Sequence, residues 1–128
     1  MLQQHLRELS KHYPLWIDNA YTFVVVENVP LPAGYNCKQP QVLVELPKDY
    51  PQSPPGVGNS RVYVPANLRY DFRILKDVHQ NRGPWYSTPG FGPWASVCYQ
   101  WIRWDPRRDD LIIFLEMVRA NLWHPPAQ

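Results

Sequence analysis

Apolar residues recur with helical spacing at the start of the chain. Leu2, Leu6, Leu9 and Tyr13 follow one another at steps of four, three and four residues. This spacing places them on one face of an N-terminal helix. Pro14 is expected to end the helix, because the residue before a proline is pushed out of helical geometry.

A second apolar stripe predicts a helix near the end of the chain. Its members share one helical face: Leu111, Phe114, Leu115, Val118 and Leu122. Asp109 and Asp110 precede the stripe, where carboxylates stabilise the positive end of the helix dipole. Asp105 and Pro106 have the pattern of a capping residue followed by a first-turn proline. Leu115 and Val118 are therefore expected to be buried against the rest of the fold.

Between these helices, β-branched and aromatic residues predict strands at 21–29 (YTFVVVENV), 41–46 (QVLVEL) and 61–64 (RVYV). Residues 65–106 show little periodicity, and Gly, Pro, Trp and Tyr dominate from 82 to 94. An irregular stretch of this length inside a compact domain is usually functional. The order of elements predicts an α+β fold with a small antiparallel meander sheet and a long ordered loop, in one domain spanning 1–128.

Composition narrows the class of protein. Hydrophobic residues make up 45% and charged residues 19%, which is typical of a compact protein rather than a disordered one. The formal charge of +2 comes from scattered Lys and Arg, so we expect no nucleic-acid partner. No apolar run approaches the roughly 18 residues of a membrane span, and the N-terminus has a polar helix pattern rather than that of a signal peptide. We therefore expect a cytoplasmic protein.

The two cysteines are Cys37 and Cys98. In a reducing compartment they are expected to be free thiols, one of them a candidate nucleophile, although two cysteines can also pair. None of the four histidines lies at ligand spacing from a cysteine, so we expect no metal and no other cofactor.

One motif carries a resemblance to a known family. Residues 50–55 read Tyr-Pro-Gln-Ser-Pro-Pro and resemble the Y-P-x-x-P-P signature of ubiquitin-conjugating enzymes (UBC fold). The order of elements around the motif resembles that family from helix to helix, with one cysteine in an irregular loop before Trp104-Asp105-Pro106. Residues 31–36 (LPAGYN) and 42–47 (VLVELP) look like the bacterial branch, whose members are encoded in antiphage islands with ubiquitin-like proteins or cGAS-like nucleotidyltransferases.

The resemblance implies a UBC-like fold and a specific chemistry. Cys98 would carry the C-terminal glycine of another protein as a thioester, supplied by an activating enzyme or another acyl donor. It would then transfer that acyl group to a lysine of a target protein without a cofactor. A thiolate is a suitable nucleophile for such a carrier because it gives a reactive thioester.

The residues leave several candidates for the donor to the oxyanion of the transition state. The family places an Asn in a His-Pro-Asn motif a few residues before the cysteine, whereas Gly90 stands at that spacing here. His79 and Asn81 form the nearest equivalent, and Asn81 would have to be returned to Cys98 by the loop after it. The alternatives are a backbone N–H or a hydroxyl group, with Ser96, Tyr86 and Tyr99 as candidates.

Two functions remain open at this point. The first is a conjugating enzyme that uses Cys98, and the second is a non-catalytic UBC-like interaction module that kept the fold without the chemistry. A loop histidine such as His79 is more often a solvated residue than a proton acceptor, and both interpretations stay open. The tyrosine–proline motif is expected to be structural in either case. Gln52 and Ser53 are polar where the family often has an aromatic residue for ligases, so we expect no ligase of that kind.

Overall fold

The structure is a computed structural model that describes residues 1–75, 78–79, 82–97, 99 and 102–123. Within these residues it has two helices and six strands. The helices are α1 (Leu2–Ser10) and α2 (Leu111–Trp123), and the strands are β1 (Leu15–Ile17), β2 (Phe23–Val26), β3 (Val42–Glu45), β4 (Val62–Pro65), β5 (Val78–His79) and β6 (Trp94–Val97). The fold is therefore α+β, as the order of elements predicts.

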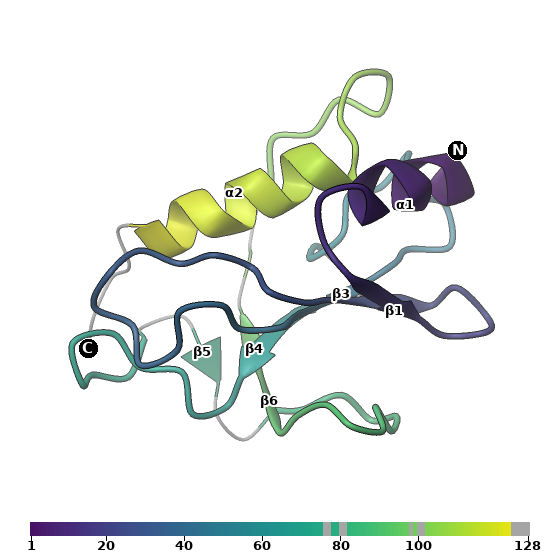
Figure 1. Ribbon diagram of the computed structural model, residues 1–128. Coiled ribbons are helices and arrows are strands. Elements are labelled where there is room, and N and C mark those ends of the chain that lie inside the picture. Colours follow the sequence, from purple (N-terminus) through teal and green to yellow (C-terminus); the bar gives the residue numbers. More distant parts are fainter. Residues whose placement is uncertain (76–77, 80–81, 98, 100–101, 124–128) are drawn as a thin grey trace.

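The strands form a single antiparallel sheet in the order β1-β2-β3-β4-β6-β5. The first four strands are a meander, and β6 follows β4 in space with β5 at the edge. Both helices lie on one side of this sheet, and the loop that joins β5 to β6 extends on the other side (Figure 1). Successive side chains of a strand point to opposite faces, so each strand contributes to both sides.

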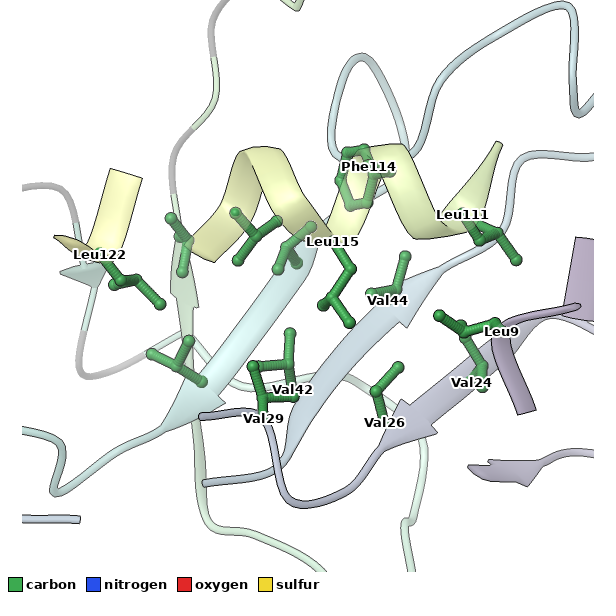
Figure 2. Packing of buried hydrophobic residues seen from close by; sticks show 14 of the residues in the cluster. Leu9, Val24, Val26, Val29, Val42, Val44, Leu111, Phe114, Leu115 and Leu122 are labelled. Carbon is green, nitrogen blue, oxygen red and sulfur yellow. The ribbon is translucent and has the colours of Figure 1, made fainter. Parts of the chain in front are cut away.

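The face under the helices is an aliphatic core. Val24, Val26 and Val44 point from β2 and β3 toward Leu115 and the rest of α2 (Figure 2). In α2, Leu115 is 1% exposed, and Val118 is fully buried. The predicted orientation of the second helix is therefore confirmed. Burying such side chains is the main source of folding free energy in a domain of this size.

The helix boundaries differ from the predicted ones. Helix α1 ends at Ser10, before Pro14, and a turn follows it. Helix α2 begins at Leu111, and its cap is Asp110, whose carboxylate accepts a hydrogen bond of 2.9 Å from the Ile113 N–H. The prediction that Asp105 and Pro106 begin the helix is wrong, because they form a separate turn in which the Asp105 carbonyl accepts the Arg108 N–H at 3.0 Å.

The sheet is larger than the predicted meander. Strand β1 follows Pro14 directly, and strands β5 and β6 lie inside the segment predicted to be an irregular loop. The second strand begins at Phe23 rather than at residue 21, because Tyr21 has a φ of 56° in a turn. The Asp18 carboxylate closes this turn by accepting the Thr22 N–H at 2.7 Å and the Phe23 N–H at 3.0 Å.

The second face of the sheet is aromatic. Phe23, Leu43, Tyr63 and Trp94 form a separate cluster with Val25, and the loop between β5 and β6 covers it. Tyr86 of that loop stacks on Phe23, with ring centroids 4.5 Å apart, and donates a hydrogen bond of 2.8 Å to Glu45 Oε2. The middle of the proline- and tryptophan-rich loop is thus a cover for the sheet.

Candidate active site

An open pocket of about 380 Å³ lies where strands β4, β5 and β6 meet at one end of the sheet. Its floor is a row of three side chains in register. Tyr63 of β4 is opposite Ser96 of β6, and Ser96 is opposite His79 of β5. Directly opposed residues of antiparallel strands point to the same face, so this row belongs to the second face of the sheet.

Ser96 is the buried polar residue of this row. Its exposed fraction is 6%, although it lines the open pocket. Among the residues that the structure describes, its hydroxyl group has no hydrogen-bond partner. A buried hydroxyl without a partner is destabilising. Its presence at the pocket therefore favours a ligand that forms a hydrogen bond with it. His79, beside it, is exposed at the pocket wall.

Two arginines give the pocket a positive charge. Arg61 Nη1 donates hydrogen bonds to the carbonyl oxygens of Gly58 and of Ser60, the latter at 3.1 Å, which hold the guanidinium at the wall. Arg82 follows β5 and donates its backbone N–H to the His79 carbonyl at 3.3 Å. No carboxylate is present among the described residues that line the pocket. Cationic surroundings of this kind favour a thiolate or another anion.

Glycine residues form the rim on the side of the proline motif. Gly56 has a φ of +84°, and a Cβ there would lie 3.3 Å from both Tyr99 Cδ2 and Val62 Cγ2. Its N–H donates to Ser60 Oγ at 2.9 Å. Only glycine fits such a backbone conformation and such a close approach without strain. Gly58 and Gly83 also line the pocket, so backbone atoms rather than side chains form much of its rim.

Tyr99 closes the pocket toward α2. Its ring lies against Gly56, and Ile102 Cδ1 is close to the same glycine. Burial raises the pKa of Tyr99 to about 12, against a hydrogen bond with Asn121 of α2 that lowers it. The phenol is therefore neutral at physiological pH and connects the pocket to the final helix.

The tyrosine–proline motif leads into this rim and is structural, as predicted. Tyr50 is 8% exposed, and its hydroxyl lies 2.7 Å from His5 Nδ1 of α1. Trp104 Nε1 donates a hydrogen bond of 2.7 Å to the Pro51 carbonyl. The Tyr50–Pro51 peptide bond is cis. The motif thus ties the segment before the pocket to α1 and to the residues that precede α2.

The structure places only some of the predicted site residues. Cys98 and Asn81 lie outside the described residues, and His79 lines the pocket. Val97 and Tyr99, the residues bonded to Cys98 on either side, both line the pocket. Cys37 is an exposed free cysteine in the loop between β2 and β3, and no residue of that loop lines the pocket.

Sequence reasoning missed the two arginines of the pocket. Arg61 and Arg82 are 21 positions apart in the chain, and the pairing of β4 with β6 and of β6 with β5 brings them together. No local spacing signals that arrangement. The described residues contain no group of three or more His, Cys, Asp or Glu side chains placed to hold a metal ion. In the same part of the chain, no helix has the length and apolar character needed to cross a membrane.

Comparison with known proteins defines the class of protein. Residues 2–70 match the family model described as prokaryotic E2 family E, which is just over half of the chain. The class is therefore that of E2-like proteins, for which a ubiquitin-conjugation-like function is indicated. The chain belongs to the prokaryotic E2 family E.

The match has a clear boundary. It covers α1, strands β1 to β4 and the tyrosine–proline motif, and it ends at Tyr70, before β5, β6 and Cys98. His79, Ser96 and the two chain neighbours of Cys98 therefore lie outside the matched segment. Searches of curated proteins and of solved structures find no significant match.

Proposed function

We propose that this chain is a ubiquitin-conjugating-enzyme-like transferase that carries an acyl group as a thioester on Cys98. The acyl group is the C-terminal glycine of a ubiquitin-like protein or of a cGAS-like nucleotidyltransferase, and the acceptor is a lysine of a target protein. The observation that carries the proposal is the pocket lined by both chain neighbours of Cys98, in a member of a prokaryotic E2 family. The activity belongs to a single UBC-like domain formed by residues 1–128 and serves bacterial antiphage defence in the cytoplasm.

The charge of the pocket supports thiol chemistry. Arg61 and Arg82 line it, and no described lining residue is a carboxylate. Nearby cations favour the thiolate over the thiol, and the thiolate is the form that attacks an acyl donor. In the loading step, the Cys98 thiolate forms a bond to the carbonyl carbon of the donor, the C–S bond to the activating enzyme breaks, and the sulfur of that enzyme leaves as a thiolate.

His79 is the proton acceptor for the second step. Its ring is exposed at the pocket wall, opposite Ser96 and within the same strand pairing as Val97. A lysine side chain attacks only as the neutral amine, after its ammonium form has lost a proton. The nitrogen then loses a second proton as the amide forms. An imidazole at this place takes a proton from the attacking nitrogen. The C–S bond then breaks and returns a thiolate on Cys98.

The test is whether a thioester forms on Cys98. Purified protein is mixed with its activating enzyme, the modifier protein and ATP, and the products are separated with and without a reducing thiol. We expect an adduct that the reductant removes. Cys98→Ser should convert it into a reductant-resistant oxyester, because an alkoxide leaves far less readily than a thiolate. Cys37→Ser is the matched control and should load normally.

Two outcomes contradict the proposal. An adduct that is lost in Cys37→Ser and kept in Cys98→Ser would move the nucleophile to the exposed cysteine. No adduct on the wild-type protein, with an activating enzyme that loads another carrier in the same mixture, would favour a non-catalytic UBC-like interaction module.

A further inference from the structure

We propose that the hydroxyl group of Ser96 is the hydrogen-bond donor to the oxyanion formed when the thioester is attacked. This inference rests on the proposed function and adds to it the group that stabilises the transition state. It replaces the family's asparagine with a residue of strand β6. Strands hold side chains more rigidly than loops do, which suits a preorganised donor.

The Ser96 side chain is buried beside the open pocket. The side chain is 6% exposed in a strand whose four residues are all buried, yet it lines an open pocket. Its neighbours on β6 are apolar: Ala95 is fully buried, and Val97 is 9% exposed. Its hydroxyl has no hydrogen-bond partner in the described part of the chain. A buried hydroxyl in that state is available to a ligand that brings an acceptor.

Ser96 is close to the proposed nucleophile in the chain and to the proposed proton acceptor in space. Ser96 is two residues before Cys98 in the chain. Two residues of fully extended chain span at most about 7 Å, so this separation bounds the distance between the two Cα atoms. On its other side, Ser96 is directly opposite His79 of β5. The donor and the proton acceptor therefore lie side by side on one strand pair, and the nucleophile follows the donor by two positions in the chain.

The other hydroxyl candidates fit the role less well. Tyr86 donates its hydroxyl hydrogen to Glu45 Oε2 at 2.8 Å and does not line the pocket. Tyr99 lines the pocket, but it lies outside the strands, and its ring packs beside Gly56 at the rim. Ser96 is the candidate that lines the pocket from within a strand, with a hydroxyl group that no described residue engages.

Attack on the thioester breaks one bond for each bond that it forms. The lysine nitrogen forms a bond to the thioester carbonyl carbon, and the π electrons of the carbonyl move to its oxygen. Ser96 Oγ–H donates a hydrogen bond to that oxyanion and keeps its proton. His79 takes a proton from the nitrogen. When the carbonyl forms again, the C–S bond breaks and the electron pair leaves with the Cys98 sulfur as a thiolate.

The experiment measures the discharge of the Cys98 thioester without requiring the activating enzyme for loading. The full chain is loaded by thiol exchange with a synthetic peptide that ends in a diglycine thioester, and single-turnover discharge to free lysine and to hydroxylamine is followed. Ser96→Ala should slow both discharge reactions by about 10²-fold, the usual loss for one oxyanion donor. Ser96→Thr keeps the hydroxyl on a β-branched side chain that suits a strand and should restore most of the rate.

Matched variants separate this role from others. Thr88→Val removes another buried hydroxyl, which accepts a hydrogen bond from Trp94 Nε1 outside the pocket, and should discharge at the wild-type rate. His79→Ala should slow attack by lysine much more than attack by hydroxylamine, because hydroxylamine is already unprotonated at neutral pH. Ser96→Ala should slow the two equally, which a loss of proton transfer would not do.

Each result decides between the two proposals. If wild-type protein discharges the peptide and Ser96→Ala does so at the same rate, the donor assignment is wrong while the transferase remains. If Asn81→Ala shows the 10²-fold loss and Ser96→Ala does not, the donor is Asn81. If the wild-type protein forms no thioester with the peptide or with its activating enzyme, the proposed function fails and this inference fails with it.

Discussion

The two faces of the sheet are packed in different ways. The face under α1 and α2 is filled by aliphatic side chains from strands and helices, such as Val44 and Leu115. The opposite face carries Phe23, Tyr63 and Trp94, is covered by one loop, and continues into the pocket beside Ser96. One face is closed by regular elements, whereas the other becomes polar and open at one end. The difference indicates that stability depends mainly on the helix face, whereas the proposed chemistry is assigned to the loop face.

The largest effect should come from the helix face. Leu115→Ala removes a side chain that is 1% exposed between α2 and the sheet, and should lower the free energy of unfolding by about 2–5 kcal/mol. Ile113→Ala on the same helix is the control, since Ile113 is 46% exposed, and should change it by no more than about 0.5 kcal/mol. Urea denaturation measures both. Equal losses would mean that α2 does not bury the predicted face.

A smaller effect is expected at the pocket rim, where two glycines form a matched pair. Gly56 and Gly58 both have positive φ, but a Cβ at Gly56 would meet Tyr99 and Val62, whereas a Cβ at Gly58 would meet open space. Gly58→Ala should cost about 1 kcal/mol from the backbone alone, and Gly56→Ala about 2–3 kcal/mol. Gly56→Ala should also slow discharge of the thioester, because Tyr99 follows Cys98 in the chain. Similar losses in both variants would show that the contact with Tyr99 does not matter.

The covering loop should contribute less than the helices. Tyr86→Phe keeps the stacking on Phe23 but removes the hydrogen bond to Glu45, and should cost about 1–2 kcal/mol. Tyr21→Phe is the control because Tyr21 is 42% exposed, and its stability should stay close to that of the wild type. Discharge of a thioester should be unchanged in both variants. A loss as large as that of Leu115→Ala would remove the proposed difference between the faces.

The smallest effect is a pH dependence at the turn before β2. Desolvation raises the pKa of Asp18, but hydrogen bonds from the Thr22 side chain and from backbone N–H groups outweigh it and hold the pKa below its ordinary value of 3.8. The folded pKa is depressed, so this stabilisation is present above 3.8 and is lost as the pH falls through the lower folded pKa. Asp18→Asn should make the urea midpoint less sensitive to pH in that range. An unchanged pH profile would contradict the assignment.

Long periodic segments of this fold were predictable from the sequence, and short ones were not. The stripe that includes Leu111, Leu115 and Val118 defines the buried side of α2 without any tertiary information. All four residues of β6 are buried, so β6 has no alternation of exposed and buried positions. Such a strand is defined by its partners in space rather than by its own residues.

The candidate site was predictable only in part for the same reason. His79 and Asn81 resemble the His-Pro-Asn motif of the family, which makes His79 a candidate from the sequence. Ser96 is one of several hydroxyl candidates. Their pairing across β5 and β6, and the approach of Arg61 and Arg82, depend on the register of strands far apart in the chain. The family resemblance placed Cys98 in the chain but could not indicate what surrounds it.

The outer strand β1 has a consequence for how the molecule behaves at high concentration. A long exposed strand edge offers unpaired N–H and C=O groups to other chains and promotes aggregation. The edge strand β1 has only three residues. The sheet therefore presents little edge at β1 onto which another copy could add a strand, and self-association through strand addition there is disfavoured.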